Sequence, residues 1–297
     1  MDVQKAMLIY NGKAGQKDVY DSLKKCVPVL ASHIDQLIIM KTKRSLHAKE
    51  ICEKYGDQVE LVIILGGDGT VHECINGLSR LEKRPVVAIL PGGTCNDFSR
   101  SLQISQDIQE AVEQLVKGEM VSVDAVKVNE DYFINFWGIG LVTETSNHIR
   151  ESEKAILGRV SYFLSALRTM KDLKPFKYRL QRDHEMEEGK AVMILVTNGS
   201  YIGTNPLPFI DISVNDGYAE IVVVNEANVT LLKDIFEIGV LEEKNKDQHI
   251  QLFRAKEIYI ETEDELDVDM DGEVYLNTPC KLEILHHHFR MLKPSQT

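Results

Sequence analysis

Two glycine-rich segments could bind a phosphate-bearing ligand, because each directly follows an apolar run. Residues 66–70 read Gly-Gly-Asp-Gly-Thr after the run 61–65, and residues 91–97 read Pro-Gly-Gly-Thr-Cys-Asn-Asp after the run 86–90. A glycine turn between a strand and a helix lets backbone N–H groups approach an anion without interference from a Cβ atom. In α/β sheets these turns lie at the carboxyl edge, where such ligands bind. The candidate ligand-binding residues are Gly66, Gly67, Asp68, Gly69, Thr70, Gly92, Gly93, Thr94, Asn96 and Asp97.

The same residues also fit a purely structural interpretation. Thr70 is a good N-cap for a helix, and Asp97 is a carboxylate that a helix dipole favours at its start. Neither segment is a P-loop or a Gly-x-Gly-x-x-Gly turn.

The first predicted strand ends at Asn11, and the loop that follows carries Lys13, a point charge suited to phosphate.

The first 120 residues alternate between strand and helix patterns, which predicts a doubly wound α/β domain. We predict strands at 6–10, 37–40, 61–65 and 86–90 and helices near 17–31, 45–55, 70–82 and 106–118. Residues 61–65 are apolar throughout, as expected of a strand that is buried on both faces. The predicted nucleotide-binding domain covers residues 1–123, and the tail 283–297 could return to it.

The pattern changes after residue 120 to strands without regular intervening helices. We predict a hairpin from 121–128 and 132–137, and further strands near 176–182, 190–197, 218–224, 256–262, 266–270 and 273–276. Helices are expected only near 158–171 and 228–240. Residues 124–282 should therefore form an antiparallel β-sandwich domain.

Composition excludes some classes of protein. The chain has 297 residues and a net charge of −12, so it is not expected to bind nucleic acid. Five scattered cysteines argue for reduced thiols in a cytoplasmic protein. No apolar run approaches the roughly 20 residues that a membrane-spanning helix needs. A homodimer is the common default for such a chain.

The two glycine segments together resemble the diacylglycerol kinase catalytic family, which includes sphingosine kinases and bacterial lipid kinases. The resemblance extends along the chain. Supporting matches are Asn11–Gly15, where Gly12 and Ala14 replace Pro and Ser, the segment that begins at Thr42, Glu73, Asn76-Gly77, Asp124, Phe133-Ile134-Asn135, Asn198-Gly199, Asp216-Gly217 and Asp271-Gly272-Glu273.

The resemblance implies a kinase that uses ATP and Mg²⁺ to phosphorylate a lipid hydroxyl, with diacylglycerol as the expected acceptor. By the same resemblance the nucleotide lies in the interdomain cleft. Asp271 is the general base, with Asp68 and Glu273 as further catalytic carboxylates. The implied nucleotide-binding set adds Asn11, Lys13, Thr42 and Glu73 to the glycine turns, and the implied metal ligands are Asp216 and Asp124.

Four alternatives stay open. Asp-Gly between strands is a common two-residue hairpin turn, so Asp271 and Asp216 could be structural. An NAD kinase shares the Gly-Gly-Asp-Gly-Thr motif, and a non-catalytic nucleotide-binding regulator could keep the same fold. The basic segment 150–182 suits an anionic membrane surface, where the protein would meet its lipid substrate transiently, but it also suits a solvated helix face.

Overall fold

The computed structural model describes residues 3–12, 16–140, 143, 174–207, 212–225 and 250–295. The chain divides into two compact units. Unit 1 comprises residues 1–124 and 287–297, and unit 2 comprises residues 125–286. Two strands, β5 (Glu119–Val128) and β18 (Cys280–Lys293), continue from one unit into the other.

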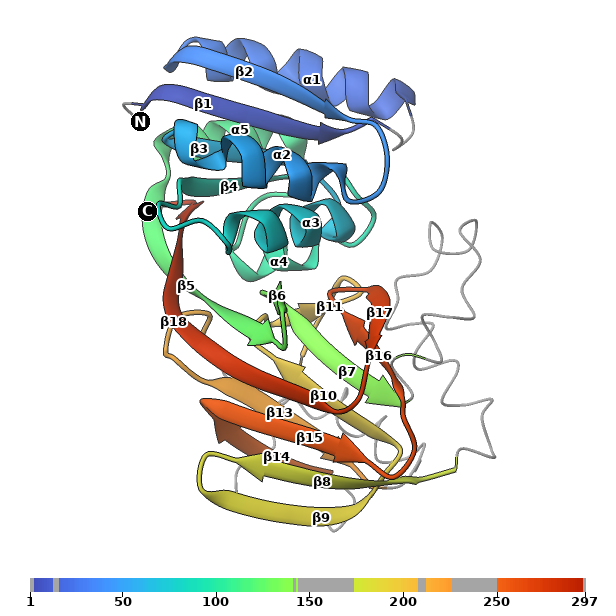
Figure 1. Ribbon diagram of the computed structural model, residues 1–297. Helices are drawn as coiled ribbons and strands as arrows, with labels where there is room; N and C mark the ends of the chain where they lie inside the picture. The colour runs from blue at the N-terminus through green and yellow to red at the C-terminus, as the bar shows by residue number, and fades with distance from the viewer. Residues whose placement is uncertain are drawn as a thin grey trace. The chain divides into compact units, whose positions relative to one another are not determined.

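Unit 1 is built on a parallel sheet with the strand order β2-β1-β3-β4, followed by the last residues of β18 (Figure 1). The strands are β1 (Val3–Asn11), β2 (Ile34–Thr42), β3 (Leu61–Gly66) and β4 (Val86–Pro91). Every residue of β3 is buried, as its unbroken apolar sequence predicts. Met291 of β18 pairs with Val87 of β4, so the C-terminal tail does return to the first sheet.

Helices cover this sheet as the alternating pattern predicts. They are α1 (Gln16–Ala31), α2 (His47–Tyr55), η1 (Gly56–Gln58), α3 (Asp68–Leu78), α4 (Asp97–Ser101) and α5 (Ile108–Lys117). Helix α1 packs against α5, whereas α2 packs against α3. Strand β1 is followed by β2 on one side, and β3 lies on its other side. The strand order therefore reverses between β1 and β3, where open α/β sheets bind their ligands.

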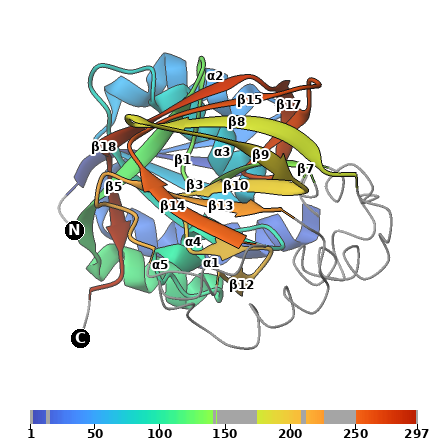
Figure 2. The ribbon, with the colours of Figure 1, turned by 90° about the horizontal axis from the view of Figure 1, so that it is seen from below.

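The described part of unit 2 contains two large antiparallel sheets beside the two-stranded pair of β11 and β12, so the expected sandwich is confirmed. One has the order β14-β13-β10-β7-β16-β17, and the other joins the first part of β18 to β15, β8 and β9. In Figure 2, β8 and β15 lie in one layer and β10 and β13 in the other. Strands β5 and β6 form the predicted hairpin beside β18. The remaining bounds are β6 (Asp131–Phe133), β7 (Phe136–Gly140), β8 (Phe176–Arg182), β9 (Glu185–Ala191), β10 (Met193–Thr197), β11 (Tyr201–Ile202), β12 (Asn205–Pro206), β13 (Ala219–Val224), β14 (Ile250–Ala255), β15 (Glu257–Thr262), β16 (Asp267–Met270) and β17 (Glu273–Asn277).

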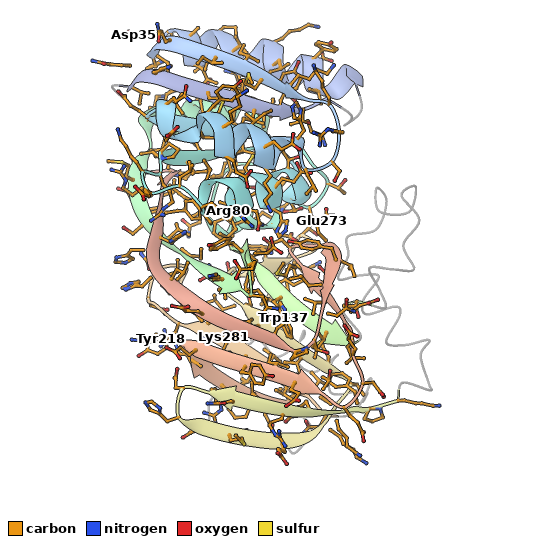
Figure 3. The ribbon with its side chains drawn as sticks, viewed as in Figure 1. Asp35, Arg80, Trp137, Tyr218, Glu273 and Lys281 are labelled. Carbon is orange, nitrogen blue, oxygen red and sulfur yellow. The ribbon has the colours of Figure 1, made fainter. Side chains whose placement is uncertain are left out.

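The core of unit 2 takes apolar side chains from both sheets. Trp137 on β7, labelled in Figure 3, is fully buried there with Ile194 of β10 and Ile258 of β15. The sequence pattern did not predict strands β9, β11, β12 and β14, and it placed no strand as long as β18. The helices expected near 158–171 and 228–240 lie outside the described residues.

Candidate functional site

The two glycine turns of unit 1 are in direct backbone contact. The N–H of Gly92 donates to the carbonyl of Gly66 at 3.0 Å. A Cβ atom on Gly93 would lie 2.4 Å from the Cα of Gly67, and one on Gly67 would lie 2.9 Å from the Cα of Gly93. No side chain fits between the turns, which explains why glycine occupies both positions.

Asp68 joins the two turns with its side chain. Its Oδ1 accepts the N–H of Asp97 at 2.7 Å, and its Oδ2 accepts the N–H of Asn96 at 3.0 Å. These two N–H groups are therefore engaged by a carboxylate. The start of α3 stays the candidate anion-binding site, because the first N–H groups of a helix lack a partner in the preceding turn, although those of Thr70 and Val71 donate to the carbonyl of Gly67.

Asn96 closes the second turn upon itself. Its backbone is left-handed, with φ of 53°, a conformation that asparagine tolerates better than most residues. Its Oδ1 accepts the N–H of Gly93 at 2.8 Å, and its amide donates to the carbonyl of Gly93 at 3.0 Å. Thr94 at the tip of this turn is exposed. The turn thus has a fixed shape before any ligand arrives.

A group of side chains that could hold a cation lies beside these turns. Ligand atoms of Asp68, Cys95 and Asp97 all lie within 4.8 Å of one another. Asp97 is only 3% exposed. Carboxylate oxygens are the ligands that Mg²⁺ prefers, and Mg²⁺ completes its shell with water, whereas a thiol is a poor ligand for so hard a cation. The two aspartates therefore fit Mg²⁺.

Asp124, also predicted to bind metal, is fully buried at the end of unit 1. Its Oδ1 accepts the N–H of His287 at 2.6 Å, so it fixes β18 against β5. Asp216, the other predicted metal ligand, belongs to unit 2.

The remaining predicted nucleotide contacts of unit 1 surround the ends of β1 and β2. Asn11 and Thr42 are opposite each other in the parallel register, and Thr42 is buried. A Cβ atom on Gly12 would lie 2.6 Å from the carbonyl oxygen of Thr42, so the β1 loop passes close to β2. Lys13 lies outside the described residues.

Glu73 has a structural task in this part of unit 1. Its two carboxylate oxygens accept the N–H groups of Leu46 at 2.8 Å and Ala48 at 3.0 Å. Leu46 is left-handed, with φ of 63°, and offers α2 no side-chain cap. Glu73 therefore caps α2 from α3, and it positions the loop after Thr42. Its role in nucleotide binding stays a prediction.

In unit 2, Asp271 forms the predicted two-residue hairpin turn with Gly272. Met270 pairs with Glu273, and both turn residues have positive φ, 52° for Asp271 and 90° for Gly272. That combination is typical of a type I′ turn. The N–H of Gly272 also donates to Oδ1 of Asp269 at 2.7 Å. Glu273 is exposed at the start of β17 (Figure 3).

The Asp271 carboxylate has a second role, because a cradle of backbone N–H groups holds it. Oδ1 accepts the N–H groups of Asn135 and Phe136, both at 3.0 Å, and Oδ2 accepts that of Ile134 at 3.4 Å. Asp271 is only 5% exposed. These donors explain why the strand predicted at 132–137 is broken between β6 and β7. Three backbone donors therefore hold the Asp271 carboxylate in one orientation.

A second layer of contacts supports this cradle. The N–H groups of Asn198 and Gly199 both donate to the carbonyl of Asn135 at 2.9 Å, and the Asn198 amide donates to the carbonyl of Ile134 at 2.8 Å. A Cβ atom on Gly199 would lie 1.8 Å from Oδ1 of Asn135. Asn135, Asn198 and Gly199 match motifs of the family, but the motifs alone did not predict a contact with Asp271.

The residues around Asp216 do not fit the predicted second metal ion. Oδ1 of Asp216 accepts the N–H of Tyr218 at 3.0 Å, and Oδ2 is in contact with the guanidinium of Arg254. The Arg254 side chain also lies 3.4 Å from Oε1 of Glu220 and stacks on the Tyr218 ring. A permanent cation already balances this carboxylate, so we derive no metal ion at Asp216.

Glu220, beside that arginine, is a buried acid. It is 2% exposed, and its Oε2 has no hydrogen-bond partner among the described residues. Burial, reinforced by the charge of Asp216 and opposed by Arg254, raises the pKa of Glu220 to about 7.

The described end of the basic segment, residues 174–182, is largely neutralised by glutamates. Lys177 pairs with Glu263 at 2.9 Å, and Arg179 pairs with Glu188 at 2.7 Å and Glu261 at 3.4 Å. Arg182 likewise pairs with glutamates of β9. Counting charges along 150–182 missed these partners because they lie on β9 and at the end of β15. Residues 150–173 lie outside the described part.

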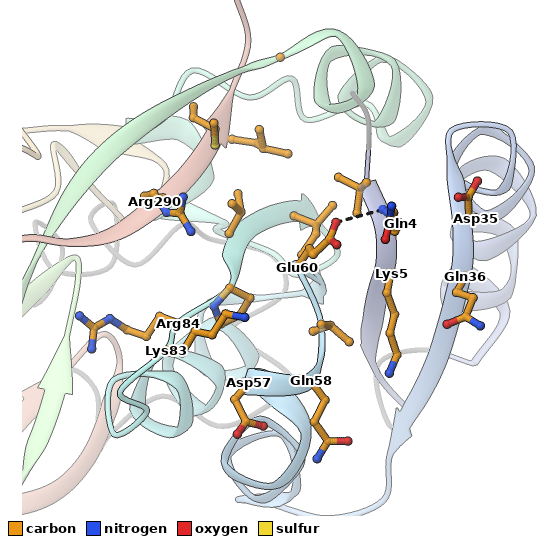
Figure 4. Close-up of a pocket in the computed structure, with 18 residues that line it drawn as sticks. Gln4, Lys5, Asp35, Gln36, Asp57, Gln58, Glu60, Lys83, Arg84 and Arg290 are labelled. Carbon is orange, nitrogen blue, oxygen red and sulfur yellow. Dashed lines mark hydrogen bonds between the residues drawn. The ribbon is translucent and has the colours of Figure 1, made fainter.

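A cavity of about 970 Å³ lies at the amino ends of the unit 1 strands, at the opposite edge from the glycine turns (Figure 4). Its lining carries charges of both signs, among them those of Lys83, Arg290, Glu60 and Asp57. It contains none of the predicted site residues.

Among the described residues, no helix combines the length and apolar character that crossing a membrane requires.

Comparison with known proteins identifies the family. Residues 5–128 match the diacylglycerol kinase catalytic domain, and residues 139–293 match the YegS C-terminal NAD kinase beta sandwich-like domain. A protein of Staphylococcus carnosus named "Putative lipid kinase" is 31% identical over 97% of this chain and 96% of its own length. A Staphylococcus aureus protein of the same name is 32% identical over 96% of each.

Solved structures agree with this assignment. One from Bacillus anthracis, titled a "putative diacylglycerol kinase", is 44% identical and superposes with a TM-score of 0.90 over 99% of this chain and 96% of that one. Another from the same organism, titled a diacylglycerol kinase, is 38% identical, with a TM-score of 0.83 over 99% and 98%. The shared motifs, both matched domains and the similarity over nearly the full length lead to one conclusion: this chain belongs to the diacylglycerol kinase family of lipid kinases.

Proposed function

We propose that the protein transfers the γ-phosphoryl group of ATP to the hydroxyl of a membrane lipid, and that this lipid is diacylglycerol. The observation that carries the proposal is the cradle of Asp271. A buried carboxylate with three backbone donors is held in one orientation, and the reaction needs such a group to accept the proton of the attacking hydroxyl.

The residues of each unit support different parts of the reaction. The N–H groups at the start of α3, beside the first glycine turn, would donate to the phosphates. The carboxylates of Asp68 and Asp97 would hold Mg²⁺, which neutralises phosphate charge when it is bound. As the lipid oxygen forms its bond to the γ-phosphorus, Asp271 takes the hydroxyl proton, the bond from that phosphorus to the bridging oxygen breaks, and ADP leaves.

The acceptor determines where the protein works. Diacylglycerol resides in the bilayer, so the protein meets it at a membrane surface, and we propose a transient association with anionic lipid. The described cations of β8 are engaged by glutamates, so we assign the attraction to the basic residues of 150–173.

The test is phosphate transfer from labelled ATP, with Mg²⁺, to diacylglycerol in mixed micelles. NAD and a sphingoid base run in parallel. Labelled phosphatidic acid supports the proposal. Labelling of NAD alone would establish an NAD kinase instead, and labelling of the sphingoid base alone would change the acceptor.

Asp271→Asn tests the base with little change of shape. We expect it to reduce the transfer rate by about 10²–10⁴-fold, the usual contribution of general-base help. Asp267→Asn is the matched control, because Asp267 is an exposed carboxylate in the same hairpin. A full rate in Asp271→Asn would remove Asp271 from the role of base.

A further inference from the structure

Gln106 lies outside the glycine motifs, yet its side chain contacts the second glycine turn. It belongs to the loop between α4 and α5 and is half-buried. Its Oε1 accepts the side-chain amide of Asn96 at 3.2 Å. Asn96 is the residue whose side chain bonds both backbone groups of Gly93. A residue that belongs to neither motif is therefore in direct contact with the residue that closes the turn.

The contacts of the Gln106 nitrogen fix which way its amide points. Nε2 donates to the carbonyl of Ile104 and to Oγ of Ser99, both at 3.0 Å. The Ser99 hydroxyl has a single hydrogen, and it donates that hydrogen to the carbonyl of Asn96 at 2.8 Å. Both partners of Nε2 are thus acceptors, so they require the NH2 end of the Gln106 amide. The oxygen of that amide must then face Asn96.

The orientation of Gln106 in turn fixes the orientation of Asn96. Because it faces the oxygen of Gln106, Asn96 must present its NH2 group there, and its Oδ1 is left to accept the N–H of Gly93. If the Asn96 amide were reversed, its oxygen would face Oε1 of Gln106 and the carbonyl oxygen of Gly93. Neither of these atoms can donate a hydrogen bond. The amide of Gln106 therefore selects the one orientation of Asn96 that closes the turn.

The loop that carries Gln106 is itself held in place. The N–H of Ser105 donates to Oε1 of Gln114 at 2.8 Å, and the Ser105 hydroxyl donates to Oε2 of Glu110 at 2.7 Å. Asp107 caps the start of α5 by accepting two N–H groups of its first turn. Gln106 lies between these anchors, so its side chain starts from a backbone that α5 keeps fixed.

The backbone of the second turn shows which group this arrangement leaves for a ligand. Four of its N–H groups are engaged within unit 1, namely those of Gly92, Gly93, Asn96 and Asp97. Thr94 lies at the exposed tip, and its N–H donates to no acceptor among the described residues. Backbone N–H groups in turns of this kind bind anions. The shape of the closed turn thus determines where Thr94 presents its donor.

We propose that Gln106 is a positioning residue for nucleotide binding: it fixes the amide of Asn96, and thereby the shape in which the second turn presents Thr94 to a phosphate. The inference rests on the proposed function, because it requires the nucleotide to lie on the glycine turns. Gln106 acts through Asn96 and has no contact of its own with the phosphate.

The first experiment measures the dissociation constant of the full-length chain for a non-hydrolysable ATP analogue with Mg²⁺, by isothermal titration. Gln106→Met keeps the length of the side chain but removes its donors and its acceptor. We expect it to raise the dissociation constant by about tenfold, the scale of one hydrogen bond. Gln106→Glu keeps an oxygen for Asn96, so it should cause a smaller rise. Gln109→Met is the matched control on α5, because the Gln109 amide donates to Glu113 and should leave the affinity unchanged.

A double-mutant cycle shows whether Gln106 acts through Asn96. Asn96→Gly removes the amide but keeps a residue that tolerates the left-handed backbone. In that background Gln106→Met should add little to the dissociation constant, so the two losses should be far from additive. Thermal unfolding of each variant separates a cost to the fold from a cost to affinity.

The wild-type titration is read first, because it tests the proposed function by itself. A wild type that does not bind the analogue would remove the nucleotide site and, with it, any role of Gln106 there. If the wild type binds, unchanged affinity in Gln106→Met would make the residue structural only, even if the variant is less stable. Additive losses in the cycle would show that Gln106 does not act through Asn96.

Discussion

At the scale of single residues, the candidate base depends on neighbours that are remote in sequence. Gly199 is the most sensitive of them, because any Cβ atom there would collide with Oδ1 of Asn135. Asn135 and Phe136 supply the two shorter hydrogen bonds to Asp271. An alanine at position 199 would therefore disturb the Asp271 carboxylate indirectly, by displacing Asn135.

We predict that Gly199→Ala lowers the rate of lipid phosphorylation by at least tenfold, because displacement of Asn135 disturbs the cradle. Steady-state kinetics would show the change in kcat with a smaller change in the KM for ATP, since the turns proposed to bind the nucleotide belong to unit 1. A variant with normal kcat would show that the cradle does not control the base.

A second prediction at this scale concerns the pH dependence of stability. The pKa of Glu220 is raised from 4.5 in the unfolded chain to about 7 in the fold. Below pH 4.5 both states are protonated and carry no penalty. As the pH rises from 4.5 to 7 the unfolded chain ionises first, so folding loses up to about 3 kcal/mol, and the loss is constant above pH 7.

Glu220→Gln should remove that loss. Urea unfolding of wild type and variant at pH 5 and pH 8 measures it: the wild type should lose more stability than the variant between these values. The exposed acid Glu257 on β15 offers the control, because Glu257→Gln should leave the wild-type difference unchanged. Parallel profiles for Glu220→Gln and the wild type would contradict the raised pKa.

At the scale of elements, the shape of the proposed nucleotide site depends on how closely the two glycine turns approach each other. Gly93 and Gly67 meet backbone to backbone, and Asp68 ties the loops together with two hydrogen bonds. We predict that Gly93→Ala separates the turns and weakens nucleotide binding by at least tenfold. Isothermal titration with a non-hydrolysable ATP analogue measures the affinity, and thermal unfolding reports the cost to the fold. Unaltered affinity in a destabilised variant would show that the contact is structural only.

The pairing of β8 with its neighbouring strands also explains why the number of basic residues in 150–182 overstates the positive charge of that surface. The cations of β8 alternate along the strand and face glutamates of β9 and β15, so the described surface forms a ladder of opposite charges. Exposed pairs of this kind contribute little stability, roughly 0–1 kcal/mol each. These ion pairs do, however, neutralise basic side chains that the sequence suggested would bind an anionic membrane.

At the scale of the whole molecule, unit 1 is completed by the last strand of the chain. Phe289 and Met291 of β18 are buried in unit 1, although they lie more than 150 residues beyond Asp124, where the first part of unit 1 ends. We predict that Phe289→Ala destabilises the protein by about 3–5 kcal/mol, the usual cost of removing a buried phenylalanine side chain. Arg290→Ala, at the exposed neighbouring position, should change stability by less than about 0.5 kcal/mol. Equal effects in urea unfolding would contradict the placement of β18 in this core.

The sequence by itself determined the features that depend on local pattern. Alternating apolar and helical periods defined the parallel sheet, and glycines directly after apolar runs located the turns at its carboxyl edge. Motifs around Asp68, Asp97 and Asp271 indicated the family. These signals are readable because each arises within a few residues along the chain.

Only the tertiary structure decided how those residues are used. In the fold, Asp68 accepts two backbone N–H groups of the second glycine turn, and Glu73 caps α2. It also built the Asp271 cradle from segments at 134–136 and 198–199, and placed Arg254 where a metal ion was expected. A side chain's hydrogen-bond and charge partners come from strands and loops that are distant in sequence, and no local pattern records which of them will meet.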